Sequence, residues 1–153
     1  MKQKQLLAIG WREWVHLPDL GLPWLKAKID TGARTSCLHA FSVEPFTQNS
    51  EQWVRFGIHP HQEDTDTEVY CTAKVVDERI VTDSGGHQEQ RFVISTLLVM
   101  GDMQWPIEVT LTNRDNMRFR MLLGRTAMQG KVSIDPAASF LLGKPPKHLR
   151  KQG

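Results

Sequence analysis

The chain has 153 residues, of which 40% are hydrophobic and 24% charged, and it carries a formal net charge of +2. This length fits a single domain that buries about two-thirds of its unfolded surface, and the composition is that of an ordinary soluble globular protein. The small net charge gives no reason to expect a nucleic-acid partner. The longest nearly apolar run, Val93 to Met100, contains Ser95 and Thr96 and is too short to cross a bilayer, so we expect no membrane partner.

The N-terminal segment starts with basic residues and continues with an apolar stretch of about six residues. No small-residue cleavage site follows, so we expect no secretory signal. Trp11 and Trp14 predict that this segment is buried, because covering two tryptophans contributes several kcal/mol at about 25 cal/mol per Å². The sequence leaves open whether residues 1–23 form an additional strand or a dimer seam.

An apolar strand from Trp24 to Ile29 leads into Asp30-Thr31-Gly32, and a second apolar stretch follows directly. This pattern places a carboxylate on a tight loop between two strands. Gly32 removes side-chain bulk where the backbone turns or lets a ligand approach, and the Thr31 hydroxyl can hydrogen-bond nearby. A carboxylate on so rigid a turn can be positioned for catalysis. By itself the motif is not specific, because most copies of Asp-Thr/Ser-Gly are ordinary Asx turns.

The middle of the chain has the pattern of strands. Glu51–Ile58 and Gln104–Thr112 alternate in part and are rich in β-branched and aromatic residues. Val69–Val81 and Glu89–Met100 flank a turn with a Gly-Gly tip at residues 82–87, and this arrangement predicts a long hairpin.

Helical periodicity is almost absent, and the one helix we expect is a single turn from about Arg125 to Gln129. Many strands joined by short turns predict an all-β fold, a closed or nearly closed β-barrel. We expect residues 1–142 to form this single domain. Residues 143–153 contain two prolines and four lysines or arginines and predict a basic C-terminal tail.

Three landmarks follow one another along the chain: Asp-Thr-Gly-Ala at residues 30–33, the Gly-Gly turn, and the apolar run 121–123 that ends in Gly124-Arg125 before the short helix. Together they resemble the retroviral-type aspartic peptidases, and the resemblance covers roughly residues 24–142. Segments 28–36, 105–112 and 121–125 are similar to a bacterial family of retropepsin-like proteins, often labelled ATP-dependent zinc proteases. The resemblance implies a retropepsin-like barrel of the acid-protease type.

The resemblance also implies hydrolysis of peptide bonds by a pair of aspartates. Two carboxylates about 3 Å apart share one proton, so the neutral acid polarises the scissile carbonyl while the ionised acid takes a proton from water. The chain has one Asp-Thr-Gly and about half the length of pepsin-like enzymes. The second carboxylate must then come from a homodimer in which Asp30 meets its two-fold copy.

The site residues are carried over by the same resemblance. Asp30, Thr31 and Gly32 are the catalytic candidates, with Thr31 bonding across the dimer axis. The substrate-binding candidates are Ala33, Arg34, Gly85, Gly86 and Arg125. The two glycines would form a flexible flap tip that closes over substrate and excludes water, and Gly124-Arg125 would brace the floor of the site.

The chain departs from its viral relatives directly after the Asp-Thr-Gly-Ala motif. They carry acidic residues there, one of which pairs with the arginine of Gly-Arg, whereas this chain has Arg34 and Thr35. Arg125 therefore loses its expected partner, and Arg34 adds positive charge near the cleft. Guanidinium groups bind carboxylates in bidentate fashion, which favours an acidic or glutamate-rich peptide as substrate. The plain alternative is that Arg34 is a solvated surface residue.

The zinc label of the bacterial family offers an alternative function. The motifs His-Glu-x-x-His and Cys-x-x-Cys are absent, as is a Walker-type nucleotide loop. The densest ligand-like cluster consists of His59, His61, Glu63, Asp64 and Asp66. A solvated polar loop explains it more simply, so we assign neither a metal nor a cofactor and keep a zinc protease as the alternative.

Cys37 and Cys71 are too few for a disulfide framework, and we expect both to be small buried hydrophobic residues of a cytoplasmic protein. The sequence thus predicts a hydrolase that acts on a peptide or protein substrate. A third interpretation keeps the fold and the dimer but makes the chain a binding module, which grips an acidic peptide without cleaving it.

Overall fold

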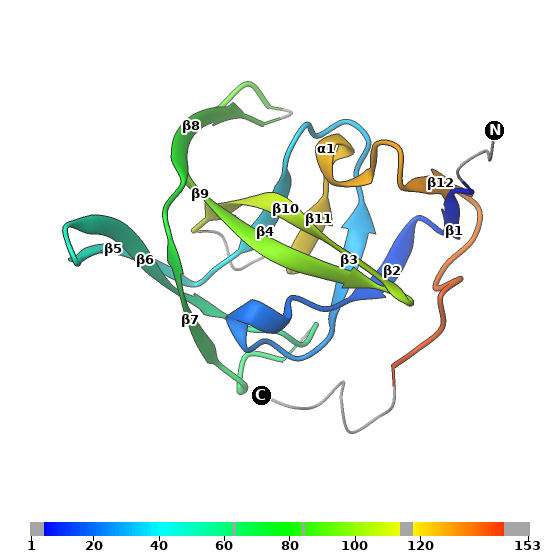
Figure 1. Ribbon diagram of the computed structural model, residues 1–153, viewed down its shortest axis with the longest axis horizontal. Helices are drawn as coiled ribbons and strands as arrows, with labels where there is room; N and C mark the ends of the chain where they lie inside the picture. The colour runs from blue at the N-terminus through cyan, green and yellow to red at the C-terminus, as the bar shows by residue number, and fades with distance from the viewer. Residues whose placement is uncertain (1–4, 63, 84, 114–117, 146–153) are drawn as a thin grey trace.

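The computed structural model describes residues 5–62, 64–83, 85–113 and 118–145 (Figure 1). Nearly all of the regular structure is β-strand, as the sequence predicts. The strands are β1 (Leu7–Ile9), β2 (Arg12–Val15), β3 (Leu25–Ile29), β4 (Ser36–His39), β5 (Ser42–Gln48), β6 (Glu51–Ile58), β7 (Val69–Lys74), β8 (Asp77–Thr82), β9 (Gln88–Met100), β10 (Met103–Thr112), β11 (Met121–Leu123) and β12 (Val132–Ile134). A 3-10 turn, η1 (Pro18–Leu20), and the single-turn helix α1 (Arg125–Met128) complete the described structure, and α1 confirms the predicted helix.

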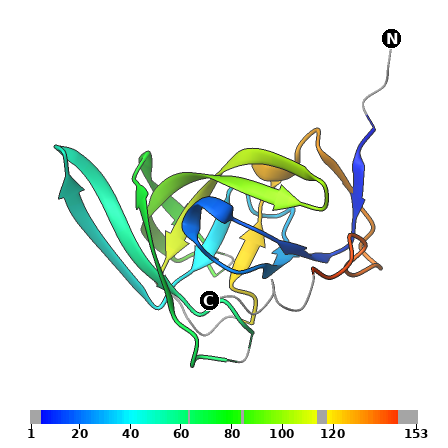
Figure 2. The same ribbon diagram turned by 60° about the horizontal axis from the view of Figure 1, so that its bottom comes forward.

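The strands form three sheets. The largest has seven strands in the order β2-β3-β11-β4-β10-β9-β8, the second is β5-β6-β7, and the third pairs β1 with β12. The β5–β6 hairpin reaches away from the large sheet in both Figure 1 and Figure 2. The seven-stranded order is open, with β2 and β8 at its edges, so the predicted barrel closure is not confirmed. One isolated bridge, in which His16 and Val99 exchange backbone hydrogen bonds of 3.0 and 2.8 Å, ties the chain after β2 back to β9.

The predicted long hairpin is wrong in its first arm, because the chain changes sheets between β7 and β8. The Val75 N–H donates to the Gln52 carbonyl over 3.0 Å, whereas the Val76 N–H donates to the Val93 carbonyl over 2.8 Å. β7 therefore pairs with β6, and only β8 pairs with β9 across the turn. Alternating residues predict that a strand exists but not its partner, which depends on packing across the sheet.

Alternation along β10 shows how one face of the large sheet reaches the core. Residues 105, 107 and 109 are buried, whereas residues 104, 106 and 108 are exposed. The indole N–H of Trp105 donates to the Ala127 carbonyl over 2.8 Å and so fastens α1 to the sheet. Cys37 and Cys71 are buried as predicted, and neither forms a disulfide.

The N-terminal segment, residues 5–20, adds two short strands and η1 to the fold, a role that the sequence left open. β1 lies parallel to β12 of the same chain. Trp11 packs edge-on against Phe119 with ring centroids 6.0 Å apart, and Trp14 lies against Phe140 at 6.3 Å. Both tryptophans are half-buried, so the segment is packed onto the domain.

No helix in the part of the chain that the structure describes combines the length and the apolar character of a membrane span. Most of the predicted basic tail, residues 146–153, lies outside the described residues.

Candidate active site

The Asp30 loop owes its position to the order of three strands. β3 and β4 follow each other in the sequence but are not neighbours, because β11 lies between them, parallel to β3 and antiparallel to β4. The loop of residues 30–35 therefore crosses the end of β11, where Leu123 lies opposite Ile29. The chain leaves β11 directly into Gly124-Arg125, so two segments far apart in the sequence meet at this edge of the sheet.

Hydrogen bonds hold the backbone of Asp30 on both sides. Its N–H donates to the Leu123 carbonyl over 2.9 Å, and its carbonyl accepts the Ala33 N–H at 3.2 Å. The carboxylate oxygen Oδ1 accepts the Gly32 N–H at 3.0 Å. A Cβ added to Gly32 would lie 3.2 Å from that oxygen, so glycine keeps the carboxylate uncrowded. Asp30 is half-buried, while Thr31 and Gly32 are exposed.

Gly124 forms the floor under this loop. Its N–H donates to the Ser36 Oγ over 3.0 Å, and both residues are buried. A Cβ added to Gly124 would lie 2.6 Å from the carbonyl carbon of Thr35. The position therefore needs glycine because two backbone segments approach closely, and a larger residue would push the loop away.

The start of α1 fastens the far end of the loop. The Arg125 N–H donates to the Ala33 carbonyl over 2.8 Å. Thr126 donates twice to the Arg34 carbonyl, through its N–H at 3.0 Å and its Oγ1 at 2.9 Å. The first N–H groups of a helix have no partner within the helix, and here the loop carbonyls accept them. Hydrogen bonds from the backbone of Gly124 and Arg125 therefore join this segment to residues 33–36.

Two arginine side chains lie exposed at this loop. Arg125 Nη1 donates to the Thr31 carbonyl over 2.9 Å, so its guanidinium binds a backbone oxygen where the viral relatives provide an acid. The Arg34 side chain is also exposed. Among the described residues, neither arginine takes part in an ion pair. Both positive charges are therefore available to a ligand.

The turn between β8 and β9 is organised by Asp83, a residue that the sequence analysis did not single out. Its Oδ1 accepts the N–H groups of Gly85 and His87, both at 2.9 Å, and its carbonyl accepts the Gly86 N–H at 3.1 Å. Gly86 has a φ of +83°, which favours glycine. An aspartate two residues before a glycine is a common Asx-turn signal, and it could have identified this residue from the sequence.

The structure thus gathers the predicted site residues into two units. Residues 30–36 and 123–126 form one hydrogen-bonded unit that carries Asp30 and both arginines, and the Gly85-Gly86 turn forms the other. In the described ranges no hydrogen bond joins these glycines to the Asp30 loop. Closure of the flap over the site, the predicted roles of the residues and the second carboxylate stay predictions.

The alternative metal cluster finds no support in the described residues, which contain no group of three or more histidine, cysteine, aspartate or glutamate side chains arranged for a metal ion. His59 is buried and stacks on Phe41 with ring centroids 4.4 Å apart, and its Nε2 lies 3.6 Å from the Glu68 carboxylate. Asp64 accepts the Asp66 N–H at 2.8 Å. Glu63 of the predicted cluster lies outside the described residues.

The Asp-Thr-Gly loop and the Gly124-Arg125 segment lie together, as the retropepsin-like resemblance implies. A family model described as "Retropepsin-like aspartic endopeptidase RimB" matches residues 8–145. The chain belongs to this RimB-like family. The match confirms the retropepsin-like family predicted from the sequence motifs.

The curated relatives of this RimB-like chain bear a different name. Proteins described as "Probable alpha-L-glutamate ligase" from Shewanella pealeana and Desulfotalea psychrophila are 47% and 48% identical over 136 residues. The matches cover 89% of this chain but 30% and 29% of the two relatives, so the chain spans less than a third of their length. A relative from Parasynechococcus marenigrum with the same description is 47% identical over 137 residues, 90% of this chain and 29% of its own.

A solved structure shares the fold. The crystal structure of Lpg0085 from Legionella pneumophila, described as a protein of unknown function, superposes with a TM-score of 0.73 at 27% sequence identity. The match covers 90% of this chain and 99% of the Legionella chain. The RimB-like fold therefore makes up nearly all of that chain, in contrast to the ligase relatives.

Proposed function

We propose that this chain is an aspartic peptidase whose catalytic pair consists of Asp30 from each of two copies. The observation that carries the proposal is the way hydrogen bonds hold Asp30 while its carboxylate stays accessible. Its backbone is bound to the end of β11, the following loop is bound to the start of α1, and its carboxylate stays partly accessible. A catalytic group needs this combination, because an acid must be held in place and yet reach the substrate.

The chemistry requires the second copy. A lone, partly solvated carboxylate is an ordinary base, whereas two carboxylates in contact cannot both be ionised. In the dimer one Asp30 would keep a proton and polarise the scissile carbonyl, and the other would take a proton from the attacking water. The exposure of Thr31 and Gly32 in the single chain supports an interface at this loop.

The substrate we propose is a peptide rich in glutamate. Arg34 and Arg125 are exposed in the segments that follow Asp30 and β11, and among the described residues neither forms an ion pair, so side-chain carboxylates of such a peptide would bind there. The relatives named as glutamate ligases support the same chemistry, because they carry a unit like this one in a protein named for joining glutamate. The two unbridged cysteines are in keeping with a reducing compartment such as the cytoplasm.

The test is turnover of a glutamate-rich peptide by mixtures of wild-type and Asp30→Asn chains. If the site is shared by two chains, adding an equal amount of the variant to a fixed amount of wild type lowers turnover to about half once subunits exchange at random. Asp102→Asn changes an exposed aspartate in the turn between β9 and β10 and is the matched control; because this chain keeps Asp30, the same mixture should show about twice the turnover of the wild type alone.

Three outcomes would contradict the proposal. Turnover that is insensitive to the Asp30→Asn chain excludes the shared pair. Inhibition by a metal chelator would favour the zinc alternative. Saturable binding of the peptide without any cleavage would make the chain a binding module.

A further inference from the structure

The β8–β9 hairpin extends beyond the sheet that carries it. β10 pairs with β9 only from Val93 to Met100, whereas β8 pairs with residues 88–93. Among the described residues, 78–82 and 88–92 therefore form an arm of two strands that share no ladder with a third strand. A two-stranded hairpin is marginally stable in water, so side-chain contacts at its base have to hold it against the domain.

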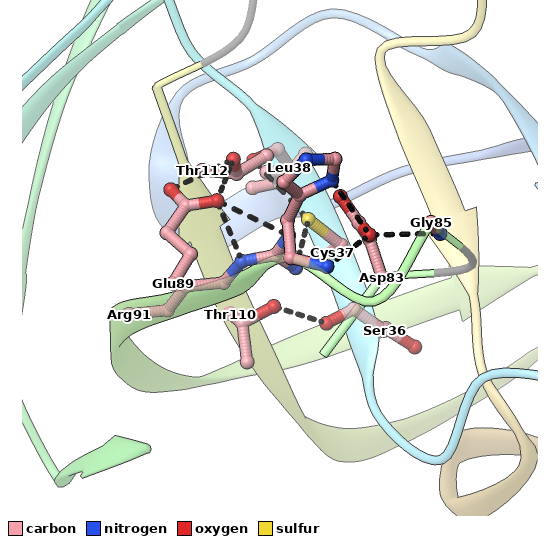
Figure 3. Close-up of polar contacts among 10 residues, drawn as sticks. Ser36, Cys37, Leu38, Asp83, Gly85, Glu89, Arg91, Thr110 and Thr112 are labelled. Atoms are coloured by element: carbon pink, nitrogen blue, oxygen red, sulfur yellow. Dashed lines mark hydrogen bonds and ion pairs between the residues drawn. The ribbon is translucent and has the colours of Figure 1, made fainter. Parts of the chain in front are cut away.

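A cluster of four side chains provides this hold (Figure 3). Arg91, whose side chain is 10% exposed, donates through Nη1 to the Cys37 Sγ on β4 over 3.5 Å. Its Nε and Nη2 lie 3.4 and 3.3 Å from the Glu89 carboxylate. The same carboxylate accepts the hydroxyl of Thr112, the last residue of β10, at 3.1 Å. The arm is thereby tied to two neighbouring strands of the large sheet.

The positive charge of Arg91 needs a neighbouring acid. Arg91 lies directly across the ladder from Arg79, and like charges in directly opposed positions destabilise a hairpin. Arg79 is neutralised by Asp77 at 2.8 Å and Glu108 at 2.9 Å, and the hydrogen bond from Arg79 lowers the pKa of Asp77. Glu89 neutralises the charge of Arg91 in the same way, and the Arg91 side chain is far less exposed than that of Arg79. Both members of this pair are partly buried, so loss of either leaves the other charged and less well solvated than a surface group.

The strand that receives Arg91 is also the strand that fixes the active-site floor. Cys37 follows Ser36, whose Oγ accepts the Gly124 N–H at 3.0 Å and whose carbonyl accepts the Thr110 hydroxyl at 3.2 Å. The base of the arm and the support of the Asp30 loop therefore meet on adjacent residues of β4.

We propose that Arg91, held by Glu89, is a positioning residue that sets how the β8–β9 arm stands relative to the Asp30 loop. The inference rests on the proposed function and on the sequence prediction that the Gly85-Gly86 turn of this arm is the flap over the substrate. Removing the guanidinium should loosen the arm and weaken substrate binding, because the arm would have to be ordered each time a peptide binds. We expect KM to rise about tenfold while kcat changes less, since Arg91 contacts neither Asp30 nor the scissile bond.

Thiol labelling of the native chain tests the anchorage without any need for activity. Cys37 is 4% exposed under Arg91, and Cys71 is 3% exposed on β7 in the separate three-stranded sheet. Burial raises the pKa of Cys71 to about 12, so this thiol is an internal reference that reacts slowly at neutral pH. In Arg91→Met, which keeps an unbranched apolar stem and removes the guanidinium, we expect Cys37 to react with a soluble disulfide reagent at least about tenfold faster, with Cys71 unchanged.

Two further variants make the result decisive. Gln90→Ala is the matched control on the arm, because the exposed Gln90 amide bonds the Glu78 carboxylate and not the cluster, so its thiol rates and KM should equal those of the wild type. Glu89→Gln keeps the side-chain shape and should raise the Cys37 rate to a smaller extent than Arg91→Met. If both cysteines of Arg91→Met react quickly because the chain has unfolded, the Cys37 rate of Glu89→Gln tests the anchorage in its place.

Unchanged Cys37 reactivity in folded Arg91→Met or Glu89→Gln would overturn the proposal, as would faster Cys37 labelling with an unchanged KM. An inactive wild type would instead count against the proposed peptidase. In that case the thiol rates, together with the affinity for a glutamate-rich peptide, still decide whether Arg91 positions the arm.

Discussion

Glu13 and Asp30 are both carboxylates that accept backbone N–H groups, yet the structure uses them in opposite ways. Glu13 is fully buried and accepts the N–H groups of Gly10, Leu141 and Leu142 at 2.7, 2.8 and 3.1 Å. Asp30 is half-buried and accepts one such bond among the described residues, from Gly32. An acid whose oxygens are saturated by the backbone holds the chain together, whereas an acid with spare oxygen lone pairs and access to solvent is available for chemistry.

The surroundings of Glu13 show how it acts as a clamp. The three donors belong to the link between β1 and β2 and to the segment that follows β12, so one side chain joins two distant parts of the chain. Next to it, the Arg12 guanidinium lies between the rings of Trp11 and Phe140, with its Cζ 4.6 and 4.8 Å from their centroids. The Asp30 loop is held instead by hydrogen bonds with the backbone of β11 and α1 and with the Arg125 and Thr126 side chains.

The largest expected effect is a loss of peptide turnover when Asp30, and not Glu13, loses its charge. Asp30→Asn keeps an oxygen that can accept the Gly32 N–H but loses the charge, so peptide turnover should fall by about 10²- to 10⁴-fold. The free energy of unfolding should change by no more than about 0.5 kcal/mol. Turnover and urea denaturation of the same preparation check both values, and a large loss of stability would mean that Asp30 is a structural clamp like Glu13.

The second expected effect is a loss of stability at Glu13, in contrast to the loss of turnover at Asp30. Glu13→Ala leaves three backbone N–H groups without their acceptor, and the free energy of unfolding should fall by about 3 kcal/mol or more. Glu13→Gln keeps one acceptor oxygen and should lose less. Urea denaturation measures the difference, and hydrogen exchange should report weaker protection at Leu141 and Leu142. Equal stability of Glu13→Ala and the wild type would show that the clamp is dispensable.

A third prediction concerns the floor that holds Asp30 in place. Gly124→Ala forces a Cβ against the backbone of Thr35, which should cost about 1–3 kcal/mol and lower turnover roughly tenfold by shifting the loop. Gly130→Ala is the matched control, because that position has a φ of +74° but no atom within 4 Å of an added Cβ. It should lose some stability to backbone strain and keep its turnover, so parallel losses of turnover would argue against a specific role for the floor.

The smallest effect concerns a third titratable group, His16. Burial lowers the pKa of His16 from its usual 6.5, although the ring bonds the Leu22 carbonyl at 3.1 Å. In the unfolded chain this histidine takes up its proton near pH 6.5, while in the folded chain it stays neutral to lower pH. Stability should therefore fall as the pH drops below 6.5 and level off below the folded pKa.

Unfolding curves at several values between pH 7.5 and 5 would measure this slope, and His16→Gln should flatten it. A steeper slope in the variant than in the wild type would contradict the assignment to His16.

Part of the site could be predicted from local sequence because its chemistry depends on residue types at short spacing. Asp30, Gly32 and the Gly124-Arg125 pair lie in segments of a few residues, so these motifs can be recognised before their distant partners are known. The acceptor of the Arg125 side chain could not be predicted, since it is the Thr31 carbonyl, a backbone atom available at every position. Asp83 was missed although a local turn signal was present.

By itself the sequence determined the strand-rich character of the chain, the single helical turn after Gly124, the burial of both cysteines and the position of the acid loop. These follow from side-chain periodicity and turn chemistry, which act over a few neighbouring residues. Only the tertiary structure decided that β11 lies between β3 and β4, that the chain changes sheets at Val75 and Val76, that the seven-stranded order stays open, and that Glu13 clamps the segment after β12. The physical reason is that strand pairing and buried polar contacts join groups far apart along the chain, and many alternative partners satisfy the same local pattern.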